Sequence, residues 1–383
     1  MNPSLKEHCL GKLQEIEADG LLRKLRSLEN QDTRIIRSGT KEFLNFSSND
    51  YLGLSTHPQL HEAFKNGIGE AVGAAASRLI TGNHPIHESL EVEIARYKKK
   101  EAALVFTSGY TAAVGTIPSL VGKGDFIVMD KLCHASLVDG ARLSGATLRV
   151  YPHLHLKRCG ELLKSCRSQA GNKNHILLVT ESIFSMDGDL APLGDLVELK
   201  KRYGTWLMVD EAHATGVLGE DGRGGEEFFG VEGGVDISMG TLSKALGCVG
   251  GFICGAQELK ALLVNRARSF IYSTGLPLLI CKAASTALRI AQEEPERRKK
   301  LQRNMETLKE SLKLPVQSPI IPWIVGNESR AMELAEKLRG EGVMIPAVRY
   351  PTVPRGKARL RISLNAVHTE KDITYLIKLL KSV

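Results

Sequence analysis

From about residue 100 onward, short runs of β-branched and other apolar residues alternate with longer stretches of helical periodicity. These runs predict buried strands at residues 103–108, 126–130, 147–151, 175–182, 205–212 and 236–241. Buried strands separated by helices are typical of a mostly parallel sheet that is covered by helices on both faces. We therefore predict an α/β fold whose ligand site lies at the carboxyl ends of the strands.

The pattern changes after about residue 275. Long helical stretches precede an apolar run at 320–325, a helix from Glu328 to about Arg339, further apolar runs and a last helix from Thr369. We predict a large domain over residues 46–275 and a smaller C-terminal α/β domain over 276–383. Residues 1–45, which start with an amphipathic pattern, are expected to form an N-terminal helical segment that packs with the small domain.

Composition narrows the class of protein. With 383 residues, 43% hydrophobic and 25% charged, the chain suits a globular protein of about two domains, and no apolar run approaches the roughly 20 residues that span a bilayer. Its seven cysteines, with no C-x-x-C pair, predict free thiols in a reducing cytoplasm. The net charge of +8 is spread along the chain, which argues against nucleic acid but could attract an anionic small molecule or a phosphate-bearing carrier.

An acid and a lysine stand at the ends of two predicted strands. Asp210 ends one strand and His213 follows it; Lys244 comes 34 residues after Asp210, behind another strand that ends at Thr241. A strand-end acid alone could simply cap the next helix. Together, the two residues suit pyridoxal phosphate (PLP), because a lysine can form a Schiff base with its aldehyde while an acid keeps the pyridine nitrogen protonated.

Two further stretches fit this interpretation. Ser108, Gly109 and Tyr110 occupy a strand-to-helix junction, where backbone N–H groups and the helix dipole can hold a phosphate. His134 offers a flat ring that could cover the face of the pyridine. The combination favours a PLP site at one edge of the sheet.

A metal site is not expected. The histidine pairs His84/His87 and His153/His155 lack a matching set of carboxylates or cysteines in the sequence.

Five stretches of the chain together resemble the α-oxoamine synthases, PLP enzymes with a type I, aspartate aminotransferase-like fold. They are the lysine motif T-L-S-K-A-L-G at 241–247 and the segments 45–54, 76–91, 181–193 and 350–364. The resemblance covers nearly the whole chain and implies a large domain with a mostly parallel seven-stranded sheet. The family condenses an amino acid with an acyl thioester and releases CO2.

The resemblance also implies roles for individual residues. Lys244 would carry PLP, Asp210 would pair with the pyridine nitrogen and His134 would stack on the ring. The expected catalytic residues are Lys244, His134, Asp210 and His213, and the phenolic oxygen of PLP would be bonded by Ser182 and His213. The expected phosphate-binding residues are Ser108, Gly109, Tyr110 and Thr241, with Ser273 and Thr274 from the other subunit of a homodimer.

On the substrate side, Arg361 matches the arginine that grips the substrate carboxylate. Arg23 and Asn49 match residues that line the acyl side, and Thr352 is counted with them as substrate-binding. The run S-R-L at 77–79 resembles the family member that joins L-alanine to a pimeloyl thioester, on CoA or acyl carrier protein, in biotin biosynthesis. Members that use glycine, such as glycine C-acetyltransferase or 5-aminolevulinate synthase, are the alternative.

Three positions depart from the pattern of the family: Cys133, Leu154 and Tyr350. They could alter the acyl pocket but do not touch the expected PLP core. A PLP aminotransferase is a further alternative. A non-catalytic subunit, such as accompanies serine palmitoyltransferase, is disfavoured because such subunits lack the lysine that stands here at position 244.

Overall fold

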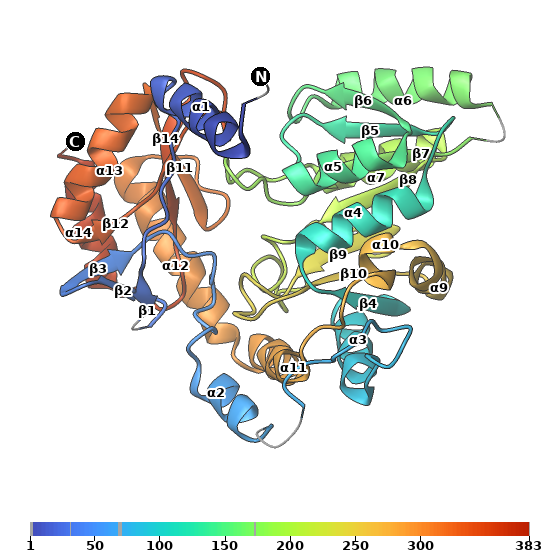
Figure 1. Ribbon diagram of the computed structural model, residues 1–383, viewed down its shortest axis with the longest axis horizontal. Helices are drawn as coiled ribbons and strands as arrows, with labels where there is room; N and C mark the ends of the chain where they lie inside the picture. The colour runs from blue at the N-terminus through green and yellow to red at the C-terminus, as the bar shows by residue number, and fades with distance from the viewer. Residues whose placement is uncertain (1–2, 31, 68–70, 172–173, 383) are drawn as a thin grey trace.

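A seven-stranded sheet forms the centre of the larger lobe of the molecule (Figure 1). The computed structural model describes residues 3–30, 32–67, 71–171 and 174–382. In the order β4-β10-β9-β8-β7-β5-β6, all neighbouring strands are parallel except β10, which is antiparallel to both of its neighbours. The predicted α/β class with a mostly parallel seven-stranded sheet is confirmed. The strands are β4 (Ala102–Phe106), β5 (Phe126–Asp130), β6 (Thr147–Tyr151), β7 (Ile176–Glu181), β8 (Trp206–Asp210), β9 (Ile237–Thr241) and β10 (Gly251–Gly255).

The six predicted apolar runs correspond to strands β4 to β9, whereas β10 was not predicted. It follows directly on the glycine-rich residues after Lys244, which indicate a loop rather than a strand. Glycine is needed where β10 begins: a Cβ on Gly251 would lie 2.4 Å from the carbonyl oxygen of Ser108. The strand therefore brings the backbone after the lysine loop against the backbone at the start of α4 (Gly109–Leu120).

Helices cover both faces of this sheet, as the alternation of its side chains requires (Figure 1). In β5, Ile127 and Met129 pack with α4 and α5, while Phe126 and Val128 pack with α6 and α7 on the opposite face. Further helices surround the strands at the β4 edge. Besides α4, the helices of this lobe are α2 (Pro58–Lys65), α3 (Pro85–Tyr97), α5 (Ala135–Ser144), α6 (Leu156–Ala170), α7 (Leu193–Tyr203), α8 (Gly225–Phe228), α9 (Gln257–Arg266), α10 (Arg268–Ile271) and α11 (Leu278–Glu293).

The smaller lobe contains a second, three-stranded sheet with the order β11-β14-β13. The elements follow the predicted order of strand, helix, strands and final helix. They are α12 (Pro295–Leu312), β11 (Ile320–Gly326), α13 (Glu328–Gly340), β12 (Val343–Met344), β13 (Ala347–Val348), β14 (Ala358–Ser363) and α14 (Glu370–Leu380).

The N-terminal segment is only partly helical, so the expectation of a helical segment over residues 1–45 needs correction. Helix α1 (Leu5–Ala18) is followed by strands β1 (Glu29–Asn30), β2 (Ile35–Ser38) and β3 (Lys41–Asn45). The strands β2 and β3 form a tight hairpin around Gly39, whose φ is +60°. Parallel pairing of β3 with β12 then joins this segment to the small lobe.

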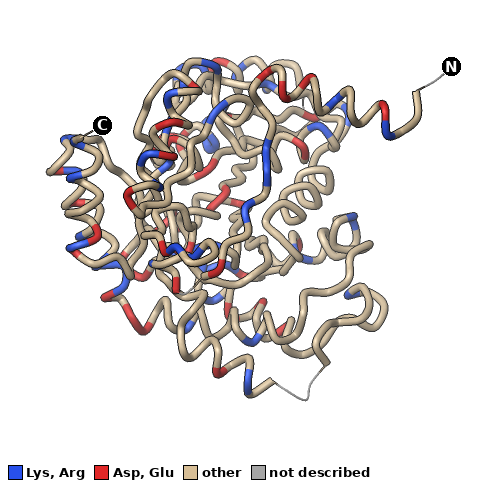
Figure 2. The backbone as a smooth tube through the Cα atoms, turned by 60° about the vertical axis from the view of Figure 1, so that its left-hand side comes forward, with Lys and Arg blue, Asp and Glu red and all other residues tan. Residues whose placement is uncertain are grey.

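Charged residues of both signs are interspersed along the chain (Figure 2). Among the described helices, none combines the length and the apolar character needed to cross a bilayer. All seven cysteines are free thiols.

Candidate active site

The end of β4 and the start of α4 form one wall of a cavity at the carboxyl edge of the large sheet. Ser108 caps α4, because its Oγ accepts a hydrogen bond from the backbone N–H of Thr111 at 3.1 Å. Gly109 opens the helix, and Thr241 lies beside it: a Cβ on Gly109 would be 3.6 Å from the Cβ of Thr241. A helix N-terminus with hydroxyl groups around it can hold a phosphate.

Two buried carboxylates lie at the ends of neighbouring strands. Glu181 ends β7 and Asp210 ends β8, directly opposite each other in the parallel register. Asp210 Oδ1 accepts a hydrogen bond from Ala212 N at 2.8 Å, and Glu181 accepts one from His134 N. Burial raises the pKa of both carboxyl groups; the positive charge of Lys244 opposes this rise.

The lysine reaches the same cavity from the loop after β9. Lys244 Nζ lies 2.8 Å from His213 Nε2, and no carboxylate forms an ion pair with it among the described residues. Desolvation lowers the pKa of Lys244 to about 8, although the nearby Asp210 and Glu181 raise it. Burial likewise lowers the pKa of His213 far below its usual value, so this ring is neutral at pH 7. The amine is therefore close to the state in which it can act as a nucleophile or base.

Eight of the predicted site residues line this one cavity, which has a volume of about 220 Å³. They are Ser108, Gly109, Tyr110, His134, Asp210, His213, Thr241 and Lys244. The cavity thus contains a helix N-terminus for a phosphate, a buried carboxylate for a ring nitrogen and a lysine for an aldehyde. This set of groups fits PLP.

Three predicted cofactor residues lie elsewhere. Ser182 is fully buried behind Asp210 and donates its hydroxyl to the backbone oxygen of Asp210 at 3.2 Å. Ser273 and Thr274 line a small cleft beside Arg78, away from the lysine. A single chain therefore does not bring Ser273 and Thr274 to the cavity that holds Lys244.

Arg361 extends from β14 of the small lobe and is 5% exposed. Its Nε donates to the backbone oxygen of Ser185 at 2.7 Å, and its Nη1 donates to Asn49 Oδ1 at 3.1 Å and to Ser363 Oγ at 2.9 Å. The guanidinium also interacts with the hydroxyl of Tyr51, and Nη2 takes part in none of the three bonds just named. This arrangement fixes the guanidinium and leaves one nitrogen available for an anionic group.

The two remaining predicted substrate residues, Arg23 and Thr352, line a larger hollow of about 960 Å³. Most of its lining is apolar, with contributions from both the N-terminal segment and the small lobe. The hollow also includes Ser48 and Pro346, and the oxygen of Pro346 accepts a hydrogen bond from the backbone N–H of Arg361. It therefore adjoins the arginine. Its apolar residues include Leu22, Leu25, Leu28, Met186, Met332, Ile345 and Val348.

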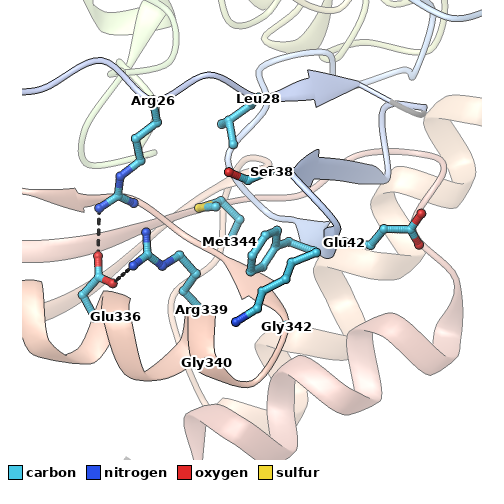
Figure 3. Close-up of a pocket in the computed structure, with 11 residues that line it drawn as sticks. Arg26, Leu28, Ser38, Glu42, Glu336, Arg339, Gly340, Gly342 and Met344 are labelled. Carbon is cyan, nitrogen blue, oxygen red and sulfur yellow. Dashed lines mark hydrogen bonds and ion pairs between the residues drawn. The ribbon is translucent and has the colours of Figure 1, made fainter.

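A neighbouring hollow of about 540 Å³ contains none of the predicted site residues (Figure 3). Glu336 bridges Arg26 and Arg339 there and neutralises much of their charge. We assign it no role in the candidate site.

The three departures from the family pattern lie outside the lysine cavity. Cys133 is buried and its thiol points to the backbone oxygen of Val179. Leu154 occupies a positive-φ position at +56° in the loop before α6. Tyr350 lies on the surface beside Arg355.

The structure places His153 between two carboxylates that stand 23 and 36 positions away in the sequence. Its Nδ1 lies 3.0 Å from Asp130 Oδ1, and its Nε2 lies 2.8 Å from Asp189 Oδ2. Burial alone would lower the pKa of His153, but the hydrogen bonds to the two carboxylates raise it to about 10. The charged ring thus ties the end of β5 to the loop after β7.

Two residues of the site were missed in the sequence. Glu181 lines the cavity and shares with Asp210 the signal of an acid at a strand end. Tyr51 contacts His213 with its hydroxyl at 2.6 Å. No local signal marks Tyr51, because it stands among the apolar residues Leu52 and Leu54 and meets a histidine 162 positions away.

Comparisons with known proteins agree with this geometry. The family model for aminotransferases of class I and II matches residues 41–380. The 8-amino-7-oxononanoate synthase of Lysinibacillus sphaericus is 46% identical over 382 residues, covering 97% of this chain and 96% of its own. That of Geobacter sulfurreducens is 44% identical and covers 95% and 94%.

Solved structures resemble the whole chain. A serine palmitoyltransferase from S. paucimobilis with bound PLP-myriocin has a TM-score of 0.91 at 26% identity and covers 99% of this chain and 98% of its own. An 8-amino-7-oxononanoate synthase from Francisella tularensis has a TM-score of 0.76 at 30% identity and covers 89% and 97%.

Proposed function

The chain belongs to the class I and II aminotransferase family and, within it, to the α-oxoamine synthases; on this premise, we propose that it condenses L-alanine with a pimeloyl thioester. The products are 8-amino-7-oxononanoate, CO2 and the free thiol of CoA or acyl carrier protein, in a step of biotin biosynthesis. The observation that carries the proposal is the amine of Lys244, 2.8 Å from His213 Nε2, in one cavity with Asp210 and the N-terminus of α4.

PLP, when bound, supplies an electron sink for the carbanion chemistry. Lys244 would hold it covalently, and the amine of Lys244, whose pKa desolvation lowers to about 8, would serve as the base for the α-proton of alanine. Asp210 would face the ring nitrogen and, as a carboxylate, would stabilise the protonated form of that nitrogen, because opposite charges attract strongly in a buried site. Ser108, Gly109, Tyr110 and Thr241 hold the phosphate at the start of α4, and His134 covers the ring and donates to the thioester oxygen as charge develops on it.

The amino acid is oriented by Arg361. Its guanidinium is held at Nε and Nη1 by protein groups, so that Nη2 can meet the alanine carboxylate. Asn49 contributes by fixing Nη1 at 3.1 Å. The contact between Nη2 and the alanine carboxylate limits the rotation of the substrate. A substrate that is already oriented loses less entropy on the way to reaction.

The acyl chain occupies the hollow beside Arg361. Its methylene groups suit the apolar lining, and Arg23 at the same hollow offers a positive charge to the distal carboxylate of a pimeloyl group. Thr352 adds a hydroxyl to this lining. These groups support a dicarboxylic acyl chain over a short acyl group as the substrate.

The active unit is a homodimer in the cytoplasm, where the free thiols remain reduced. Ser273 and Thr274 lie away from Lys244 in their own chain and reach the phosphate site of the partner. Large apolar side chains near them support an interface, since Ile80 is 76% exposed and Tyr272 is 71% exposed in the single chain.

Product analysis tests the proposal. The PLP-loaded protein is incubated with L-alanine or glycine in combination with acetyl-CoA, succinyl-CoA or pimeloyl-CoA. The products are identified by mass spectrometry. We expect 8-amino-7-oxononanoate from L-alanine and pimeloyl-CoA as the dominant product. Preference for glycine with a short acyl-CoA would contradict it, and pyridoxamine phosphate formed from the amino acid alone would indicate an aminotransferase.

A further inference from the structure

A continuous line of hydrogen-bonding groups connects the small lobe to the lysine. Arg361 Nη1 lies 3.1 Å from Asn49 Oδ1, which lies 3.2 Å from Tyr51 Oη. Tyr51 Oη lies 2.6 Å from His213 Nδ1, and His213 Nε2 lies 2.8 Å from Lys244 Nζ. Tyr51 is fully buried and His213 is 5% exposed, so water does not substitute for these contacts readily.

The hydroxyl of Tyr51 carries one proton and has two acceptors within reach. Asn49 Oδ1 already accepts a hydrogen bond from the charged guanidinium of Arg361, and its distance from Tyr51 is the longer one. The contact with His213 Nδ1, at 2.6 Å, is short for a neutral hydrogen bond. The Tyr51 hydroxyl therefore donates its hydrogen bond to His213 Nδ1, which accepts it.

The direction of the hydrogen bond from Tyr51 decides which tautomer His213 adopts. A neutral imidazole carries one N–H, and when Nδ1 accepts a hydrogen bond, the hydrogen is on Nε2. Nε2 is the nitrogen that faces Lys244 and the cavity. The ring would otherwise be free to place its hydrogen on Nδ1 and to present only a lone pair to the cavity.

We propose that Tyr51 is a positioning residue of the reaction: its hydroxyl holds His213 as the Nε2–H form, so that this ring donates a hydrogen bond toward the groups that react at Lys244. The proposal rests on the proposed function, because it assumes PLP at Lys244. The N–H stabilises the ionised phenolic oxygen of bound PLP, and it does so whichever amino acid or thioester is the substrate.

Other charges also face His213 and contribute to any titration. Lys244, Arg361 and His134 are the positive or ionisable groups whose charge acts on the ring. The carboxyl groups of Asp210 and Glu181 line the same cavity. Removal of the Tyr51 hydroxyl keeps all of these charges but also removes its contacts with Asn49 and with the side chain of Arg361, so the part that acts through His213 is isolated by comparing the effect with and without that histidine.

The test is a pH titration of the visible absorbance of the PLP-loaded protein without substrate. Without a donor at Nε2, the ionised phenolic oxygen is less stable, so Tyr51→Phe should shift the titration midpoint upward by roughly one pH unit. The matched control is Tyr97→Phe, which removes another buried hydroxyl, bonded to the oxygen of Gly222 at 2.6 Å and remote from the cavity. Tyr97→Phe should titrate like the wild type.

A double-mutant cycle locates the effect. In a His213→Asn background, Tyr51→Phe should add no further shift, because the hydroxyl acts through the ring. An unchanged midpoint in Tyr51→Phe, or an equal shift with and without His213, would overturn the proposal.

A second measurement needs no Tyr51 variant to fold. In the ¹⁵N spectrum of PLP-loaded, histidine-labelled wild-type protein, the signals lost in His213→Asn should show a protonated Nε2 and an unprotonated Nδ1; the reverse pattern would overturn the proposal. Both measurements omit substrate. The expected shift without any product from L-alanine and pimeloyl-CoA would support this inference and refute only the proposed substrates.

Discussion

Replacement of Arg361 by lysine should raise the KM for L-alanine while leaving most of kcat. Arg361 is buried, is held by Ser185 and Asn49, and leaves Nη2 for the substrate carboxylate. Lysine keeps the positive charge but presents a single ammonium in place of a planar fork. Arg361→Lys therefore removes at least one charge-assisted hydrogen bond to the carboxylate.

The size of the effect follows from that bond. A hydrogen bond to a charged group contributes about 1.5–3 kcal/mol, which corresponds to a loss in kcat/KM for L-alanine of roughly 10- to 150-fold. The carboxylate is bound before and during the reaction alike, so the loss should appear in KM. Release of free thiol, followed at saturating pimeloyl-CoA and varied L-alanine, measures both parameters.

Arg359→Lys is the matched control. Arg359 lies two residues earlier on the same strand, is 4% exposed and donates to Asp187 Oδ1 at 2.7 Å, so its charge is already paired with a carboxylate. This variant should lose some stability and keep the KM for L-alanine within about twofold of the wild type. The reasoning is refuted if Arg361→Lys leaves that KM unchanged, or if both variants raise it equally.

Other expected outcomes follow from the same structure. Lys244→Ala should still bind PLP but yield no borohydride-trapped adduct, and should lose roughly 10²–10⁴-fold or more in kcat; trapping at another lysine would contradict the assignment. His153→Ala should reduce the free energy of unfolding in urea most near pH 6, and the difference from wild type should shrink toward pH 10. Because the pKa of His153 is raised, its ring stabilises the fold fully below the pKa of a free histidine, and this stabilisation is lost as pH rises through about 10; a difference that stays constant with pH would contradict it. Gly251→Ala should lower the free energy of unfolding by about 1–3 kcal/mol, whereas Gly11→Ala, with open space around it, should not; equal stabilities would refute the close approach to Ser108.

The architecture was largely predictable because buried strands and amphipathic helices leave different periodicities in the chain. Strands β4 to β9 each contain an apolar run, and the polar residues at their ends gather at one edge for topological reasons. Strand β10 was not predicted because its first residue, Gly251, serves a tertiary contact with Ser108 that no local pattern encodes. Strands β1 to β3 are short and are completed by pairing with β12, about 300 positions later in the chain.

The candidate site was predictable where a functional side chain stands at the end of a strand or shortly after it. Asp210 and Lys244 could be paired from their positions alone, and the structure places both in one cavity. The hydrogen bonds of Tyr51 and His153 could not be predicted from the sequence. Their partners come from distant segments, and the bonds depend on the direction of the side chains. Ser273 and Thr274 illustrate the same limit, since their proposed role requires a second chain.

The most direct test of the proposed reaction is the fate of the carboxyl carbon of alanine. The PLP-loaded protein is given L-alanine labelled with ¹³C at the carboxyl group together with pimeloyl-CoA, and ¹³CO2 and free thiol are measured together. Decarboxylative condensation predicts one ¹³CO2 for each thiol released, and none when pimeloyl-CoA is omitted. Labelled pyruvate, or thiol released without ¹³CO2, would contradict it.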